Sequence, residues 1–130
     1  MEKDSDMNFK QIEEYILNIP KFRPEGSIEQ TRKFYEFLGK PGKSANIIHV
    51  AGTNGKGSVG AYLASVFKAA GVKVGRYCSP AVFSPLECWQ YDGRNMTEEE
   101  YACYMSQVKQ ACDIVALHPE EVQPTVFEIE

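Results

Sequence analysis

Apolar residues return every three or four positions in four stretches of the chain, a pattern typical of amphipathic helices. The first three stretches are followed by residues that commonly end a helix, namely Pro20, Gly39 and Gly71. Capping boxes precede the second and fourth stretches and support the same assignment: Ser27 with Gln30, and Thr97 with Glu100. The predicted helices cover residues 9–19, 28–38, 59–70 and 101–115.

Two extended runs lie on either side of the third predicted helix. Residues 47–51 form a β-branched run typical of a buried strand, and residues 72–78 form a second run. The order of strand, glycine-rich loop, helix and strand is a βαβ unit, which implies a parallel sheet. A further extended run, residues 88–91, precedes an Asp92-Gly93 turn. The predicted fold class is α/β, with a P-loop-type, mostly parallel sheet flanked by helices.

The composition fits one domain over residues 1–130, with 43% hydrophobic residues for a packed core. The net charge of −4 is spread along the chain, whereas a nucleic-acid-binding domain would present a basic face. No apolar stretch approaches the roughly 20 residues that cross a bilayer. The first residues are acidic and polar, unlike a secretory signal. We therefore expect a cytoplasmic protein without nucleic-acid or membrane partners.

The glycine-rich loop before the third predicted helix has the chemistry of a phosphate site. A strand that turns sharply into a helix presents backbone N–H groups and the positive end of the helix dipole to an anion. Glycines let the backbone approach closely, Lys56 can reach the outer phosphates, and the Ser58 hydroxyl lies near the expected place of Mg²⁺. The predicted phosphate-binding residues are Gly52, Thr53, Asn54, Gly55, Lys56, Gly57 and Ser58.

This loop departs from the strict P-loop pattern G-x-x-x-x-G-K-[ST]. The first glycine of that pattern would fall on Val50, and Gly57 follows the lysine in place of a serine or threonine. The alternative interpretation is a glycine-rich turn that carries an ordinary surface lysine. The predicted strand before the loop and the predicted helix after it supply the context of a phosphate loop, and this context favours phosphate binding.

The segment from His49 to Val59 resembles the nucleotide loop of folylpolyglutamate synthases and bifunctional dihydrofolate synthases, which belong to the Mur ligase superfamily. A glycine after the loop lysine, here Gly57, resembles the folate branch of this superfamily, whereas the cell-wall ligases usually carry a hydroxyl residue at that position. Leu38 to Pro41 resembles the L-G-x-P of the family. The resemblance runs from about Ser27 to the last residue. It implies the incomplete N-terminal ATPase domain of a Mur-ligase-like fold.

Two further matches to the family imply ligands for Mg²⁺. Tyr77 to Pro80 is similar to the family's S-P element, in which the serine binds Mg²⁺ and the following loop helps to bind the pterin. Pro124 to Glu128 resembles the F-E element, whose glutamate also binds Mg²⁺. The resemblance therefore implies Ser79 and Glu128 as metal ligands. Without it, Ser79 is an ordinary loop serine and Glu128 an ordinary exposed acid.

The resemblance implies an ATP-dependent ligase that adds L-glutamate to a folate or to dihydropteroate. The acid would attack the γ-phosphate of ATP to give an acyl phosphate, and the glutamate amine would then displace phosphate. ATP and Mg²⁺ are the expected cofactors, with Lys56 as the catalytic residue that stabilises phosphate charge. The family's further strands, third metal ligand and C-terminal domain have no match here. We therefore expect a fragment that is inactive alone.

One region departs from the family pattern. Ala81 follows Pro80 where a histidine or bulky residue is usual, and Glu87-Cys88-Trp89 stands in place of E-R-I. The missing arginine leaves the pterin contacts and the choice of substrate open. Two alternatives therefore remain, namely another Mur-type amide ligase that acts on a non-folate acid, and a degenerate nucleotide-binding module without catalysis.

Overall fold

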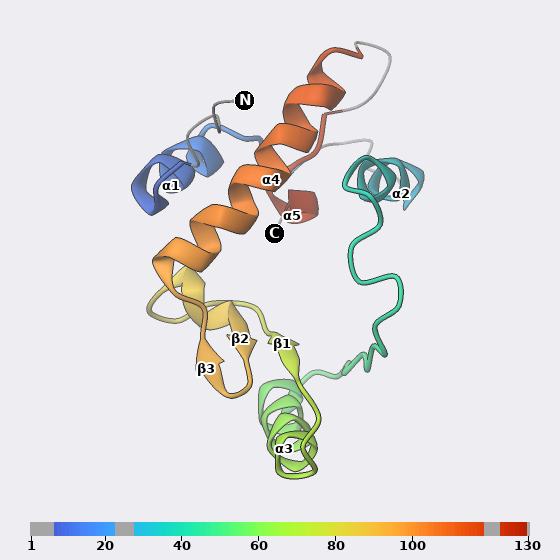
Figure 1. Cartoon of the computed structure of the whole chain (residues 1–130), viewed down its shortest axis with the longest axis vertical. Coiled ribbons are helices and arrows are strands. Elements are labelled where there is room, and N and C mark those ends of the chain that lie inside the picture. The colour runs from blue at the N-terminus through green and yellow to red at the C-terminus, as the bar shows by residue number, and fades with distance from the viewer. Residues whose placement is uncertain (1–6, 23–27, 119–122, 130) are drawn as a thin grey trace. The chain divides into compact units, whose positions relative to one another are not determined.

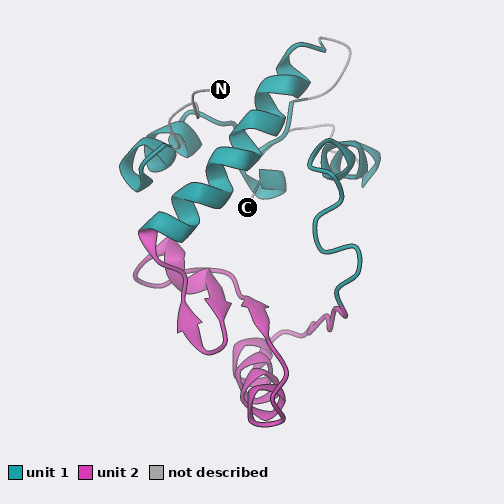
Figure 2. Ribbon diagram, viewed as in Figure 1, with its two compact units in different colours: residues 1–45, 99–130 teal, residues 46–98 magenta. Residues whose placement is uncertain are grey.

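The computed structural model describes residues 7–22, 28–118 and 123–129. The chain divides into two compact units, one holding residues 46–98 and the other residues 1–45 and 99–130 (Figures 1 and 2). The predicted capping residue Ser27 lies outside the described residues. Within the described part of the chain, no helix is long and apolar enough to cross a membrane. The assignment of residues 1–130 to one domain stays a prediction.

All four predicted helices are confirmed, and a short fifth helix follows them. The helices are α1 (Phe9–Leu17), α2 (Ile28–Phe37), α3 (Lys56–Ala69), α4 (Glu98–Ala116) and α5 (Val126–Ile129). Gly39 and Gly71 follow α2 and α3 with φ of 76° and 77°, which favours glycine at these helix ends. After α3, the Gly71 N–H donates to Lys68 O at 2.9 Å and the Val72 N–H to Phe67 O at 3.0 Å. These two bonds form a Schellman motif.

The core of the unit formed by residues 1–45 and 99–130 is built around α4. Tyr101, Met105 and Val115 of this helix are buried. Ile12 of α1 is fully buried, and the ring of Phe9 meets that of Tyr101 edge to face at 5.7 Å between centroids. Phe34 of α2 and Ile129 of α5 are buried as well. The helical periodicity of the sequence therefore identified part of the core of this unit, whereas Ile28 and Tyr104 of the predicted apolar stripes are 80% and 59% exposed.

The unit formed by residues 46–98 contains a three-stranded antiparallel sheet with strand order β1-β2-β3. The strands are β1 (Gly75–Tyr77), β2 (Trp89–Tyr91) and β3 (Arg94–Asn95), and a short 3₁₀ helix, η1 (Pro85–Cys88), precedes β2. Asp92 and Gly93 join β2 to β3 with φ of 47° and 80°. Positive φ at both residues is the geometry of a tight hairpin turn, so the predicted turn is confirmed.

The predicted parallel sheet is wrong for the described residues. Residues 47–51 form no strand, and Ile47 and Ile48 are 82% and 59% exposed. The second predicted strand shrinks from residues 72–78 to Gly75–Tyr77, which pairs with β2 instead. A strand exists only where another strand satisfies its backbone N–H and C=O groups. In the described part of the chain, the sheet that supplies such partners is the local hairpin, and residues 47–51 are not paired with it.

Two side chains tie α3 to this sheet, one near each end of the helix. The Arg76 guanidinium donates to the carbonyl oxygen of Gly57 at 2.9 Å, in the first turn. The Lys68 ammonium donates to the carbonyl oxygen of Asp92 at 2.7 Å, in the last turn. The Arg76 bond holds the backbone of the first turn of α3 and thereby the loop that enters it, whereas the Lys68 bond attaches a side chain of the last turn to the β2–β3 turn.

Candidate phosphate-binding site

The segment from Gly52 to Gly55 turns the chain into α3. The φ angles of Gly52 and Gly55 are 153° and 77°, which side chains disfavour. Gly55 is the N-cap of α3 and offers no side-chain acceptor to the first N–H groups of the helix. Residues 52–58 are all exposed. The loop therefore presents unpaired backbone donors and the positive end of the helix dipole to solvent, where an anion can reach them.

The side chain of Lys56 folds back over this loop. Its Nζ donates to the carbonyl oxygen of Gly52 at 2.6 Å. Lys56 opens α3 while Gly52 opens the loop, so the ammonium spans the glycine-rich turn from one end to the other. The carbonyl is a neutral and exposed partner, which a phosphate oxygen can replace with a stronger, charge-assisted bond.

The other predicted loop residues lie where the sequence placed them. Thr53 and Asn54 are exposed in the turn, and Gly57 and Ser58 lie in the first turn of α3. The structure thus brings all seven predicted residues into one loop and one helix start. A Cβ added to Gly52 would lie 3.6 Å from Asn54 O and 4.0 Å from Lys56 Cγ, inside the turn. Their role in binding phosphate stays a prediction.

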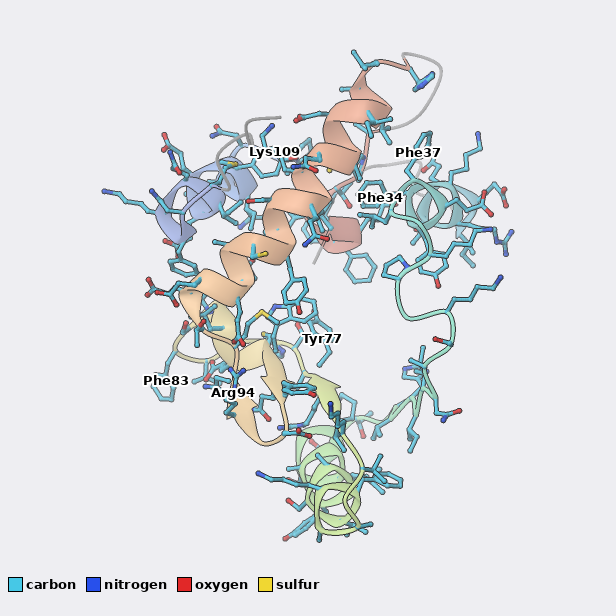
Figure 3. The ribbon with its side chains drawn as sticks, viewed as in Figure 1. Phe34, Phe37, Tyr77, Phe83, Arg94 and Lys109 are labelled. Atoms are coloured by element: carbon cyan, nitrogen blue, oxygen red, sulfur yellow. The ribbon has the colours of Figure 1, made fainter. Side chains whose placement is uncertain are left out.

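The loop that begins at Ser79 is organised by Glu87. Ser79 is exposed, and the Ser79–Pro80 peptide bond is cis. The carboxylate of Glu87 accepts hydrogen bonds from the backbone N–H groups of Val82 and Phe83, the latter at 2.7 Å. Phe83 itself is 94% exposed and projects from the loop (Figure 3). Glu87, which belongs to the Glu87-Cys88-Trp89 segment that replaces E-R-I, therefore holds the backbone of the loop that follows Ser79.

These bonds lower the pKa of Glu87, because the backbone N–H groups of Phe83 and Val82 favour the charged carboxylate. Because its pKa is lowered, the charged Glu87 stabilises the loop fully at pH values above the pKa of an unperturbed glutamate, about 4.3. This stabilisation is lost as the pH falls through the lower pKa of the folded state. We expect the Phe83 amide proton signal to titrate in NMR spectra with a midpoint below about 4.3. Glu87→Gln should abolish this transition, whereas the control variant Glu99→Gln should leave the transition unchanged. A transition that survives Glu87→Gln would contradict this assignment.

Glu128 caps the short helix α5. Its Oε2 accepts from the backbone N–H of Thr125 at 2.8 Å and from the Thr125 hydroxyl at 3.1 Å, and its Oε1 accepts from the Thr31 hydroxyl at 3.2 Å. All three donors are neutral, so the negative charge of the carboxylate is not cancelled by them. Ser79 and Glu128 belong to different compact units, and their role as a pair of metal ligands stays a prediction.

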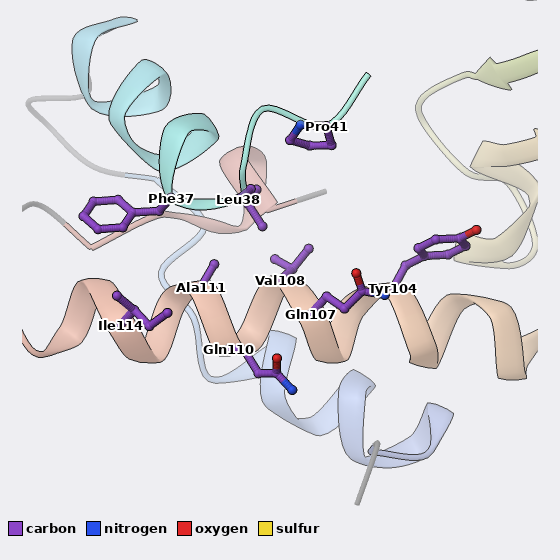
Figure 4. A pocket seen from close by; sticks show the side chains of 9 residues that line it. All are labelled: Phe37, Leu38, Pro41, Tyr104, Gln107, Val108, Gln110, Ala111 and Ile114. Atoms are coloured by element: carbon purple, nitrogen blue, oxygen red, sulfur yellow. The ribbon is translucent and has the colours of Figure 1, made fainter. Parts of the chain in front are cut away.

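A shallow groove in the unit formed by residues 1–45 and 99–130 is separate from the phosphate loop. Apolar side chains and two glutamines line it, and none of the lining residues is charged (Figure 4). It runs between α4 and the segment that follows α2. Its polar groups are the Tyr104 hydroxyl and the two glutamine amides, and the full set of lining residues is Phe37, Leu38, Pro41, Tyr104, Gln107, Val108, Gln110, Ala111 and Ile114.

Sequence reasoning missed two residues that organise the site, Arg76 and Glu87. Arg76 holds the first turn of α3, and Glu87 holds the loop after Ser79. Both bind backbone groups, which every residue carries, so the residue types in the sequence do not reveal these partners. A weak signal existed for Arg76, because it is one of two charged residues, with Lys73, in the predicted strand of residues 72–78.

No family model matches the chain, whereas individual proteins do. The dihydrofolate synthase/folylpolyglutamate synthase of Bacillus subtilis is 36% identical over 110 residues, which are 84% of this chain and 25% of that protein. The structure of folylpolyglutamate synthetase from Lactobacillus casei has a TM-score of 0.85 at 29% identity, over 95% of this chain and 31% of that one. An FPGS–AMPPCP–folate complex has a TM-score of 0.86 at 28% identity, over 95% of this chain and 30% of that one.

These matches confirm the family resemblance and the N-terminal, Mur-ligase-like fold that it implied. The chain spans about a quarter to a third of the length of these three proteins. The sequence comparison and the structure comparison both find proteins of this kind. The predicted parallel sheet is not seen in the described residues. The chain therefore belongs to the family of folylpolyglutamate and dihydrofolate synthases.

Proposed function

We propose that this chain binds the phosphates of ATP for a ligase that adds L-glutamate to a folate or to dihydropteroate. One observation carries the proposal: the Lys56 ammonium lies over the Gly52–Gly55 turn, at the exposed start of α3. The structural match to an FPGS–AMPPCP–folate complex supports both the nucleotide and the folate as ligands. Because the chain covers only part of its relatives, the reaction is proposed for the full-length gene product.

The residues of this chain would bind and orient the nucleotide. The backbone N–H groups of Gly52 to Gly57 would surround the phosphates, while the Lys56 ammonium would leave Gly52 O and donate to a phosphate oxygen. The carboxylate of the folate or pteroate would attack the γ-phosphorus, with ADP as the leaving group. The amine of glutamate would then attack the acyl phosphate, form the amide and release phosphate. This chemistry requires positioning and charge neutralisation from the protein.

We further propose that Ser79 and Glu128 are ligands of the Mg²⁺ that accompanies ATP. The donor set fits a hard cation, since both residues offer oxygen atoms. Among the described residues Glu128 has no recorded ion pair, so its charge is available to a cation. The structure groups no three His, Cys, Asp or Glu side chains into a metal site in its described part. Mg²⁺ commonly uses one or two carboxylates together with water and substrate phosphates, and Glu128 would supply one such carboxylate.

The proposal is tested by assaying the full-length gene product with Mg²⁺, ATP and L-glutamate, together with folate, dihydropteroate or a non-folate acid. We expect release of ADP and phosphate with formation of an equal amount of glutamylated folate or dihydrofolate. Product with the non-folate acid alone would identify another Mur-type amide ligase. Nucleotide binding without turnover on any acid would identify a degenerate nucleotide-binding module, and absence of ATP binding would reject the phosphate site itself.

A further inference from the structure

We propose that Arg76 is a positioning residue for the phosphate loop, which it holds in place through the first turn of α3. The proposal rests on the nucleotide-binding function proposed above. Arg76 lies in the middle of β1 and is half-buried. Its Nη2 donates to Gly57 O at 2.9 Å, and its Nη1 donates to Gln90 Oε1 at 2.7 Å. One guanidinium therefore joins the first turn of α3, which begins at Lys56, to the neighbouring strand β2.

The bond to Gln90 is part of a polar row that crosses the whole sheet. Arg76 lies opposite Gln90 in the β1–β2 register, and Gln90 lies opposite Asn95 in the β2–β3 register. The Gln90 amide accepts from Arg76 through Oε1 and donates to Asn95 Oδ1 through Nε2, at 2.9 Å. Each side chain in the row fixes the next, so the guanidinium has a defined place above the sheet.

Two glycines on one face of α3 make room for this guanidinium. Gly57 and Gly60 are three residues apart, which places them on the same side of the helix. A Cβ on Gly57 would lie 3.9 Å from Arg76 Nη2, an ordinary contact. A Cβ on Gly60 would lie 3.2 Å from Arg76 Nε and 4.0 Å from its Cδ. A methyl group at position 60 therefore requires the guanidinium or the helix to shift by a few tenths of an ångström, and the two hydrogen bonds of Arg76 oppose that shift.

The direction of the helix separates Arg76 from the phosphate donors. Backbone carbonyls of an α-helix point toward its C-terminus, while the free N–H groups of its first turn point toward the N-terminus. Arg76 binds the carbonyl of Gly57, so it contacts the first turn on the side away from the direction in which these donors point. Two of the five N–H donors of the guanidinium are used by the bonds to Gly57 and Gln90. The contact with Gly57 O therefore places the action of Arg76 on the loop through the backbone of α3.

This geometry makes the effects of Arg76 and Gly60 on nucleotide binding interdependent. We expect Arg76→Ala and Gly60→Ala each to weaken Mg-ATP binding to the full-length gene product about tenfold, measured by calorimetry. In the Arg76→Ala background, Gly60→Ala should change the affinity by less than about twofold, because the methyl group then meets no guanidinium. Thermal unfolding should show the same dependence, since alanine favours a helix more than glycine once the clash is gone.

Conservative and matched variants separate positioning from charge. Arg76→Lys keeps the charge but cannot reproduce the fork that links Gly57 O to Gln90, so we expect the loss of affinity to persist. It also replaces Arg76→Ala in the cycle if that variant does not fold. Arg94→Ala removes a cation from β3 and should leave the affinity within about twofold. Independent effects of Arg76 and Gly60, or full affinity in Arg76→Lys, would overturn the positioning role. A parent protein that binds no Mg-ATP would instead overturn the proposed function.

Discussion

Replacing Lys56 by methionine should weaken Mg-ATP binding by about tenfold to a hundredfold. The Lys56 Nζ lies 2.6 Å from Gly52 O and spans the loop, so it needs only to exchange a carbonyl for a phosphate oxygen. A hydrogen bond to a charged group contributes about 1.5 to 3 kcal/mol, and ~1.4 kcal/mol is a factor of ten in affinity. Methionine retains the length and apolar stem of the side chain and removes the ammonium. Calorimetry on the full-length gene product measures the change directly.

Lys68 offers a matched control on the same helix. Its Nζ also donates to a backbone carbonyl, that of Asp92, at 2.7 Å, but it lies in the last turn of α3 rather than the first. Lys68→Met therefore removes an equivalent charge and an equivalent hydrogen bond without touching the loop. We expect the Mg-ATP affinity of Lys68→Met to stay within about threefold of the parent. Lys68 lies at the opposite end of α3 from the loop, and solvent ions screen an exposed charge strongly over the length of the helix. Equal losses in Lys56→Met and Lys68→Met, or no loss in Lys56→Met, would remove the phosphate assignment.

The helices were predictable because their signals are local. The end of α3 requires only Gly71 and the carbonyls of the preceding turn, all within five residues of one another. The start of α3 at Lys56 was predicted three residues too late, because Gly57 and Ser58 are poor helix formers. Their place in the helix follows from the Gly55 N-cap and from the Arg76 contact at Gly57, which apolar periodicity does not record.

The sheet was mispredicted because strand pairing is not local. Residues 47–51 have a composition typical of a buried strand, but composition does not say which strand provides the partner. Residues 75–77 pair with β2, which the Asp92-Gly93 turn also joins to β3. The prediction recognised that turn and the extended run before it, yet assigned residues 72–78 to a parallel neighbour. A hairpin requires only the short connection, whereas a parallel pair requires a distant strand.

The glycine-rich turn and the helix start that follows it were predictable from residue types, whereas the side chains that hold them in place were not. A glycine-rich turn that ends in a lysine at a helix start is specified by residue type at fixed positions. Arg76 and Glu87 bind backbone carbonyls and N–H groups, which any residue carries. Glu128 was predicted as a metal ligand from the family motif, and its second role as the cap of α5 emerges only from the structure. The two roles can be separated by one substitution.

Glu128→Gln should raise the Mg²⁺ concentration that the full-length gene product requires, by about tenfold or more, because a neutral amide is a much weaker ligand for a hard cation. The substitution should leave the helix cap intact. In α1 of this chain, Gln11 already performs the same structural task, since its Oε1 accepts from the Asn8 backbone N–H at 2.8 Å in a capping box. Glutamine at position 128 can accept the Thr125 N–H in the same way. A change in Mg²⁺ dependence with unchanged thermal stability therefore reports on charge and not on folding.

Two further variants complete the argument about Mg²⁺. Glu128→Ala removes both the cap and the charge, so it should lower the thermal stability as well as raise the Mg²⁺ requirement; loss of a capping interaction costs about 1 kcal/mol. Ser79→Ala should raise the Mg²⁺ requirement less than Glu128→Gln does, because a hydroxyl is neutral and binds a hard cation more weakly than a carboxylate. The measurement is the initial rate as a function of Mg²⁺ at saturating ATP. A normal Mg²⁺ dependence in both Glu128→Gln and Ser79→Ala would show that the S-P and F-E matches are coincidental and that Glu128 serves only as the cap of α5.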